Sequence, residues 1–317
     1  MTGPSYETRW EDSTDPAPPF QARNVSVNES EKWTVGRLLS WTTEFLTGEG
    51  ATSARLDAEI LLANSLSCQR IDLYTRFDEE PGQPVRDQFR QLVRQRADGC
   101  PVAYLVGQRE FYSRQFQVSP DVLIPRPETE FIVITARDLL DQESSEAAFR
   151  IADVGTGSGN IAICLAQLLP GSSIMAIDTS AGALEVARSN IITHGVENQV
   201  ELLQSDLLAA VDQPLDMVVS NPPYVSEAEY EQLAPDVREH EPRLALVAGP
   251  TGLEVYQRLL PEALEKLRPG GWLLLETSPM ICESLVELID SSAGFGPVEL
   301  TRDLAGHARV VRTQRSS

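Results

Sequence analysis

From residue 150 onward, the chain alternates short, strongly apolar runs with longer segments of helical periodicity. The strand-like runs cover residues 150–154, 173–178, 200–204, 215–220 and 272–276, and the helical segments between them cover 160–169, 181–194 and 253–267. A parallel strand pair needs a long crossover, which is usually a helix, so this alternation predicts a mainly parallel sheet. Helices would cover both faces of that sheet. The sequence therefore predicts an α/β domain.

Composition and periodicity divide the rest of the chain into further parts. Residues 1–31 carry four prolines among acidic and hydroxyl side chains, with few aliphatic residues to bury, and predict a disordered tail. Residues 32–106 show the apolar spacing of three helices and predict a small helical domain. A hairpin from Glu110 to Val118, within a linker of residues 107–127, would join this domain to an α/β domain of residues 128–317. Near its end, residues 298–302 and 309–313 predict an antiparallel hairpin on the sheet edge.

Charge and cysteine content exclude several classes of protein. The net charge of −21 and the pI near 4.5 argue against general nucleic-acid binding, which needs clustered Lys and Arg for the phosphates. Cys68, Cys100, Cys164 and Cys282 lie far apart and match no metal-ligand spacing, so we expect reduced thiols and no metal. The first residues lack the pattern of a signal peptide, and no apolar run is long enough to span a bilayer. We therefore expect a soluble cytoplasmic protein.

A glycine-rich turn follows the first strand of the α/β domain and opens its first helix. It consists of Gly155, Thr156, Gly157, Ser158 and Gly159. Glycines at such a turn let the backbone approach a ligand closely, and the helix N-terminus supplies hydrogen-bond donors. The third glycine comes one residue earlier than in the dinucleotide motif G-x-G-x-x-G, and no Lys-Ser or Lys-Thr pair follows, which excludes a P-loop NTPase.

Polar side chains follow the next three strands where each strand ends. Asp178 ends the second strand, where it could accept hydrogen bonds from ribose hydroxyls. After the third strand, Asp206 could accept from an adenine amino group and Leu207 could pack on the adenine ring. Asn221 ends the fourth strand. Together with the glycine-rich turn, these residues predict a ligand crevice at the carboxyl edge of the sheet.

The tetrapeptide Asn221-Pro222-Pro223-Tyr224 predicts a rigid loop at this edge. Proline fixes φ and removes the backbone donor, so the loop offers acceptors in a fixed geometry. A planar NH2 group could donate one hydrogen to the side-chain oxygen of Asn221 and one to the carbonyl oxygen of Pro222, while Tyr224 covers it by stacking. An Asn-Pro turn that only ends a strand is the alternative interpretation.

These motifs, in this order, resemble class I S-adenosylmethionine-dependent methyltransferases that act on planar amino groups. Gly107 and the segments 110–112, 124–130 and 303–306 carry a closer resemblance, to the release factor glutamine methyltransferase family, over roughly residues 51 to 312. The chain departs from the family pattern at residues 276–280, where Glu-Thr-Ser-Pro-Met replaces a stretch that usually holds a Gly and a Gln. Residues 1–30 have no counterpart in the family.

The resemblance implies a Rossmann-like catalytic domain that methylates the side-chain nitrogen, N5, of the glutamine in the Gly-Gly-Gln motif of peptide chain release factors. It implies S-adenosyl-L-methionine as the methyl donor and a helical N-terminal domain that helps to recognise the factor. By match to the family motifs, Asn221, Pro222, Pro223 and Tyr224 would form the catalytic loop that holds the glutamine. The cofactor would contact Gly155, Thr156, Gly157, Ser158, Gly159, Asp178, Asp206, Leu207 and Asn221. We expect a monomer that contacts neither nucleic acid nor membrane.

Three other functions fit parts of the pattern. A glutamine methyltransferase of a ribosomal protein would share the catalytic half. A nucleic-acid amino methyltransferase, acting for example on adenine N6, would use the same loop chemistry, although the acidity and the lack of a long basic insertion argue against it. A cofactor-binding scaffold without catalysis is disfavoured by the intact tetrapeptide at residues 221–224.

Overall fold

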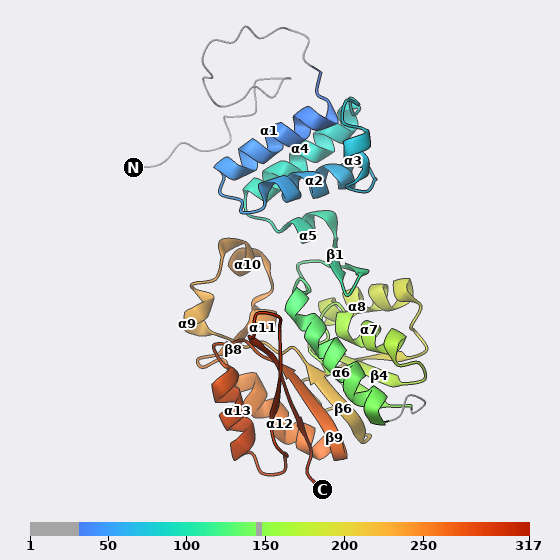
Figure 1. Cartoon of the computed structure of the whole chain (residues 1–317), viewed down its shortest axis with the longest axis vertical. Helices are drawn as coiled ribbons and strands as arrows, with labels where there is room; N and C mark the ends of the chain where they lie inside the picture. The colour runs from blue at the N-terminus through green and yellow to red at the C-terminus, as the bar shows by residue number, and fades with distance from the viewer. Residues whose placement is uncertain (1–31, 144–147) are drawn as a thin grey trace.

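The structure, a computed structural model, describes residues 32–143 and 148–317, and the tail expected at residues 1–31 lies outside these ranges. A group of helices near the N-terminus forms one end of the molecule and a larger α/β region forms the other (Figure 1). No helix within the described ranges combines the length and the apolar character needed to cross a bilayer.

Between residues 32 and 107 the structure describes five helices: α1 (Val35–Gly48), α2 (Ala54–Ser65), α3 (Asp72–Thr75), α4 (Gln83–Ala97) and α5 (Val102–Val106). Thr34 caps α1 by accepting a hydrogen bond from the backbone N–H of Arg37. Apolar side chains of the first four helices share one core, which includes Leu39, Leu61, Leu73 and Phe89. This region is therefore held together by a core separate from that of the sheet.

A hairpin leads from these helices to the α/β region. Its strands are β1 (Gln108–Phe111) and β2 (Arg114–Gln117), and its two turn residues, Tyr112 and Ser113, both have positive φ. After it come the 3-10 turn η2 (Pro127–Thr129) and helix α6 (Glu130–Glu143). The Glu130 carboxylate accepts a hydrogen bond from the backbone N–H of Tyr112 at 2.8 Å, which fixes the hairpin turn against the start of α6.

The α/β region is built on a seven-stranded sheet. Its strands are β3 (Arg150–Val154), β4 (Ser173–Asp178), β5 (Val200–Gln204), β6 (Leu215–Ser220), β9 (Leu267–Glu276), β10 (Glu299–Arg302) and β11 (Ala308–Gln314). The strand order is β10-β11-β9-β6-β3-β4-β5, with β5, β4, β3, β6 and β9 parallel and β11 and β10 antiparallel at one edge. The predicted mainly parallel sheet and the C-terminal antiparallel hairpin are thus confirmed.

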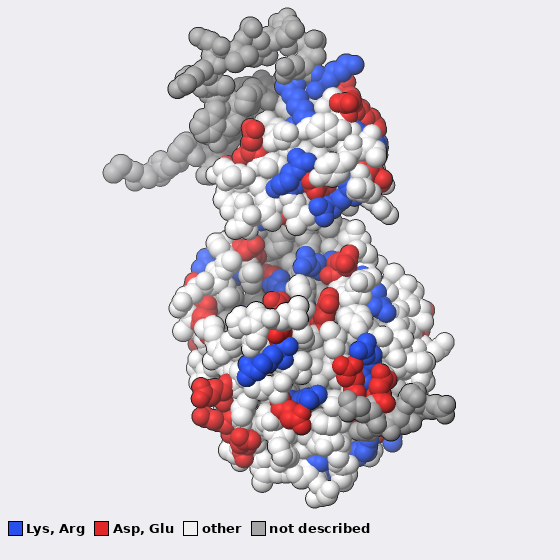
Figure 2. All heavy atoms as spheres, viewed as in Figure 1, with Lys and Arg blue, Asp and Glu red and all other residues white. Residues whose placement is uncertain are grey.

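Helices cover both faces of this sheet (Figure 1). One face packs against α6, α7 (Asn160–Leu168) and α8 (Ala181–His194), and the other packs against α12 (Glu254–Lys266) and α13 (Cys282–Ser291). The outer side of α13 carries three exposed acids, Glu283, Glu287 and Asp290, and Figure 2 shows acidic side chains along this edge of the molecule. This edge is electrostatically unsuited to binding phosphates.

Several short elements lie between β6 and α12, where the sequence analysis assigned no structure. They are β7 (Val225–Ser226), α9 (Glu227–Tyr230), α10 (Pro235–His240), α11 (Arg243–Leu246) and β8 (Val247–Gly249). Strands β7 and β8 pair with each other and not with the main sheet. This segment therefore stands apart from the sheet, beside the carboxyl ends of its strands.

Candidate functional site

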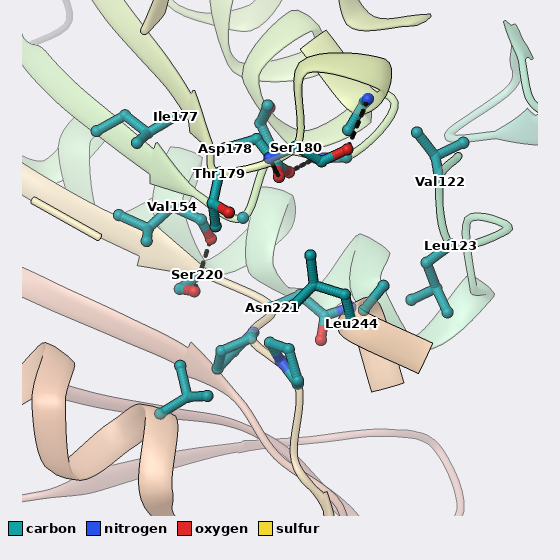
Figure 3. Close-up of a pocket in the computed structure, with 18 of the residues that line it drawn as sticks. Val122, Leu123, Val154, Ile177, Asp178, Thr179, Ser180, Ser220, Asn221 and Leu244 are labelled. Carbon is teal, nitrogen blue, oxygen red and sulfur yellow. Dashed lines mark hydrogen bonds between the residues drawn. The ribbon is translucent and has the colours of Figure 1, made fainter. Parts of the chain in front are cut away.

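A cavity of about 330 Å³ opens at the carboxyl edge of the parallel strands. In Figure 3, Asp178 and Ser180 lie on one side of the cavity and Asn221 on the other, while Val122 and Leu123 form a further wall. Of the site residues expected from the sequence, the cavity is lined by Gly155, Thr156, Gly157, Ser158, Asp178, Asp206, Leu207, Asn221, Pro222 and Pro223. The topology thus gathers residues from four strand ends into one cavity. Its volume falls within the range of small-ligand sites.

The glycine-rich turn folds over the end of β4. The backbone N–H groups of Gly155 and Thr156 both donate to the carbonyl oxygen of Ile177 at 2.9 Å. Gly155, Gly157 and Gly159 have φ values of +75°, +53° and +80°, a region that L side chains rarely adopt. The sequence needs glycine at these positions because the turn is left-handed at alternate residues. Gly159, which does not line the cavity, is the N-cap residue just before α7.

Two fully buried polar side chains support this turn from beneath, and the sequence analysis did not identify either as functional. Asp153 accepts hydrogen bonds from the Thr156 hydroxyl at 2.6 Å and from the Ala162 N–H at 3.1 Å, and burial raises its pKa to about 7. Asn190 on α8 donates to the carbonyl oxygen of Ser158. The turn is therefore fixed by its neighbours on both sides before any ligand arrives.

Asp178 lies beside this turn as the sequence predicted, but both of its oxygens already accept hydrogen bonds. The N–H of Gly157 donates to Oδ2 and the N–H of Ser180 donates to Oδ1, each at 2.9 Å. A carboxylate has about four lone-pair sites, so two remain for a ligand hydroxyl pair. Asp178 can therefore shape the turn and bind a ligand at the same time.

The residues after β5 form another part of the lining. Leu207 is buried and has a φ of +50°, a strained conformation that is uncommon for a branched side chain. Asp206 is exposed and pairs with Arg258 of α12 at 2.6 Å. Arg258 also lines the cavity. The sequence did not predict this, because Arg258 lies within a helix and belongs to no motif. This exposed ion pair places one carboxylate and one guanidinium group at the cavity rim.

In the tetrapeptide after β6, the first three residues line the cavity and the fourth, Tyr224, does not. Asn221 donates from Nδ2 to the Thr129 hydroxyl at 3.1 Å, and its Oδ1 makes no hydrogen bond within the described part of the chain. Tyr224 does not line the cavity, and its hydroxyl donates to Glu276 Oε1 at 3.4 Å. Burial raises the pKa of Tyr224. The cavity thus receives an amide oxygen and two proline rings from this loop.

The remaining wall comes from residues 242–248, which no sequence motif indicated. Pro242, Leu244, Ala245, Val247 and Ala248 line the cavity. The preceding residue, Glu241, is almost fully buried and accepts from Arg126 Nη2 at 2.5 Å and from the Ile124 N–H at 3.1 Å. Arg126 lies in the loop before η2, so one carboxylate fixes this wall to the linker that leads into the α/β region.

Comparisons with known proteins find similar families and relatives over most of the chain. Residues 37–107 match a family model described as the PrmC N-terminal domain, and residues 134–237 match the methyltransferase small domain. The chain is 47% identical over 295 residues to a release factor glutamine methyltransferase of Rhodopirellula baltica, which covers 92% of this chain and 100% of the relative. A protein of the same name from Chlorobaculum tepidum is 42% identical over 87% of this chain and 95% of its own.

Among solved structures, the catalytic domain of hMettl16 in complex with an RNA hairpin matches with a TM-score of 0.53 and 18% identity. The match covers 71% of this chain and 81% of that one. At this identity the likeness concerns the fold alone, and it is a methyltransferase fold.

Proposed function

The chain belongs to the release factor glutamine methyltransferase family, and from this membership we propose that it methylates the N5 nitrogen of the glutamine in the Gly-Gly-Gln motif of a peptide chain release factor. The methyl donor would be S-adenosyl-L-methionine. The helical region of residues 32–106 would help to recognise the factor, and the enzyme would act as a monomer without nucleic acid.

The observation that carries this proposal is the state of the Asn221 side chain. Its NH2 end is engaged by Thr129, so the amide presents an acceptor oxygen as its remaining polar group. A glutamine side chain ends in an NH2 group with two hydrogens to donate. The Asn221 oxygen and the Pro222 carbonyl could accept one hydrogen each, which suits a primary carboxamide and leaves its nitrogen directed at the cavity.

The cavity fits the proposed cofactor in size and in chemistry. Asp178 keeps two acceptor sites for ribose hydroxyls, and the left-handed glycine turn brings backbone close to the cavity without side chains in between. Leu207 and Ile177 supply apolar surface for a purine ring, and Asp206 stands at the rim. When bound, S-adenosyl-L-methionine supplies an electrophilic methyl group on a sulfonium centre.

The protein would promote transfer mainly by positioning. An amide nitrogen is a weak nucleophile because its lone pair is delocalised into the carbonyl group. Accepting both N–H hydrogens at Asn221 and Pro222 would fix the nitrogen in one orientation and favour the loss of its planarity as the new bond forms. The rigid Pro222-Pro223 pair would keep these acceptors in place without reorganisation.

The test is mass spectrometry of a purified release factor after incubation with this protein and S-adenosyl-L-methionine. We expect one added methyl group, located on the glutamine of the Gly-Gly-Gln motif, and none on a factor carrying Gly-Gly-Ala. Absence of transfer to the intact factor would contradict the proposal. Ribosomal proteins and then nucleic acid would be the next substrates to assay.

A further inference from the structure

The turn after β5 places two residues on the cavity lining in a conformation that its own sequence does not favour. Leu207 has a φ of +50°, in the left-handed region that a branched side chain rarely adopts. Leu207 and its neighbour Asp206 both line the cavity. A residue in such a conformation persists only where the surrounding structure holds it there. The contacts that hold this turn therefore decide where two of the proposed cofactor contacts lie.

One face of α12 supplies two such contacts, on either side of Leu207. Arg258 Nη2 donates to Asp206 Oδ2 at 2.6 Å, and Glu262 Oε2 accepts from the backbone N–H of Leu208 at 2.8 Å. Arg258 and Glu262 are four residues apart, about one helical turn, so both project from the same face of α12. The residues that they contact flank the strained Leu207. Two side chains of one helix thus hold the turn from both sides.

Apolar packing and a backbone contact anchor the same turn. Leu207 and Leu208 belong to the apolar cluster that contains Leu259 of α12, and both Leu208 and Leu259 are fully buried. At the start of the turn, the backbone N–H of Ser205 donates to the carbonyl oxygen of Asp178 at 3.1 Å. The turn is therefore anchored to the end of β4 at its beginning and to α12 along its length.

The ion pair between Arg258 and Asp206 also defines which acceptor the carboxylate offers. The two side chains are 55% and 62% exposed, and an ion pair this open contributes little to folding stability. Its consequence is geometric, because it holds a carboxylate that would otherwise rotate freely. Oδ2 of Asp206 is engaged, while Oδ1 makes no hydrogen bond within the described part of the chain. One fixed acceptor oxygen suits one N–H donor of a ligand.

We propose that Arg258 and Glu262 are positioning residues that make the cavity selective for a 6-amino purine. The inference rests on the proposed function, in which the cavity takes the adenosyl group of S-adenosyl-L-methionine. Adenine carries an amino group at C6, which donates, whereas hypoxanthine carries a carbonyl oxygen there, which accepts. Asp206 Oδ1 accepts from the amino group and repels the carbonyl oxygen. Arg258 and Glu262 act through the turn, by holding Asp206 and Leu207 where this discrimination is made.

A direct contact between Arg258 and the ligand is the competing explanation, since Arg258 itself lines the cavity. A guanidinium group can only donate, so a direct contact would favour the carbonyl oxygen of hypoxanthine over the amino group of adenine. Removing a guanidinium group that acts directly would raise the preference for adenine. Removing one that positions Asp206 lowers this preference. The two roles therefore predict changes of opposite sign.

Isothermal titration calorimetry with S-adenosyl-L-homocysteine and S-inosyl-L-homocysteine tests the inference. The two ligands differ only in the group at C6 and in the N1 proton that accompanies the oxo group. General damage to the cavity weakens both and leaves the ratio of their affinities unchanged. The wild-type protein should bind the adenosyl ligand at least about tenfold more tightly, as for one hydrogen bond to a charged acceptor. Equal affinities would overturn the inference.

Arg258→Met and Arg258→Lys form the first matched pair of variants. Methionine keeps most of the apolar stem and removes the guanidinium group, while lysine keeps a cationic donor. We expect the preference for the adenosyl ligand to fall at least about threefold in Arg258→Met and to stay within about twofold of the wild type in Arg258→Lys. A preference that is unchanged or raised in Arg258→Met would overturn the inference.

Glu262→Leu and Glu262→Gln form the second pair, at a position that does not line the cavity. Leucine removes the acceptor of the Leu208 N–H, while glutamine keeps a side-chain oxygen that can accept it. The preference should fall at least about threefold in Glu262→Leu and stay within about twofold in Glu262→Gln. Equal preferences in these two variants would contradict transmission through the turn.

The outcomes separate this inference from the proposed function. If the wild-type protein binds neither ligand, the proposed cofactor is wrong and the inference falls with it. If the wild-type protein methylates the Gly-Gly-Gln motif but the ligand preferences do not change as stated, only the role of Arg258 and Glu262 fails. If the preferences change as stated but no methyl group is transferred, the inference stands and the proposed substrate is wrong.

Discussion

Asn190 on α8 and Ser158 in the glycine-rich turn are joined by a hydrogen bond of 2.8 Å from Nδ2 to the Ser158 carbonyl oxygen. The same Asn190 amide exchanges two hydrogen bonds with the backbone of Gln117 in β2, at 2.7 and 3.0 Å. One fully buried side chain thus connects the hairpin to the turn that lines the cavity.

Asn190→Ala should lower the free energy of unfolding by roughly 2–4 kcal/mol, because it removes the three hydrogen bonds of one buried amide and leaves the buried carbonyl oxygen of Ser158 without this donor. Urea denaturation would measure the change. Ser189→Ala, on the exposed side of the same helix, is the control and should change the stability by less than about 0.5 kcal/mol. Equal stabilities of the two variants would show that Asn190 does not carry this connection.

Asp178→Ala should weaken binding of S-adenosyl-L-methionine by about ten- to a hundredfold, because charged acceptors for two ribose hydroxyls are lost together with those for Gly157 and Ser180. Isothermal titration calorimetry measures this directly. Asp212→Ala removes an exposed acid that does not line the cavity and should leave affinity unchanged. Unchanged affinity in Asp178→Ala would remove this residue from the cofactor site.

Asn221→Ala should lower kcat for methyl transfer by about a hundredfold or more, as expected for loss of a preorganised polar contact to the reacting group. Cofactor binding should largely survive, because Asp178 and the glycine turn are untouched. Single-turnover methyl transfer, together with calorimetry, separates the two effects. Asn198→Ala, at an exposed position, serves as the control. Activity near that of the wild type would contradict the role of the Asn221 oxygen.

Glu276 should make folding stability depend on pH. Burial raises its pKa from 4.5 to about 7, so the folded state favours the protonated form. The associated stability is present below pH 4.5 and is lost as pH rises through 7. Glu276→Gln should therefore gain stability relative to the wild type between pH 5 and pH 8, by up to about 3 kcal/mol. Urea denaturation at both pH values checks this, and a pH-independent difference would refute it.

The sequence predicted the sheet closely because its strands are short, apolar and bounded by helices. The predicted bounds of β3, β4, β5 and β6 agree with the structure, whereas β9 begins at Leu267, five residues before the expected residue 272. The earlier start contains Gly270 and Gly271, which sequence patterns assign to a turn. In the structure, Gly270 donates to the Arg315 carbonyl oxygen, a partner 45 residues away that no local pattern reveals.

The sequence predicted those lining residues that belong to a motif at a strand end. It did not predict residues whose position depends on a partner far away in the chain. Residues 155–158 of the glycine turn, Asp178, Asp206 and Asn221 all lie on the lining, as strand topology requires. No sequence pattern marked Glu241 or Glu276 as buried, since acids are rarely buried unless paired. Each is buried because of a partner distant in the chain, Arg126 for Glu241 and Tyr224 for Glu276. The expectation that Tyr224 covers the substrate stays a prediction; in the structure its hydroxyl donates to Glu276 and the residue does not line the cavity.

The wall of residues 242–248 owes its position to Glu241 and to the small pair β7 and β8, not to the seven-stranded sheet. Lengthening or exchanging such a connection costs little in loop-closure entropy and breaks no ladder of the main sheet. The shape of this wall can therefore diverge independently of the part of the cavity that the strand ends form. A fold organised in this way can reshape one wall of its cavity by replacing one surface segment while the residues at its strand ends stay unchanged.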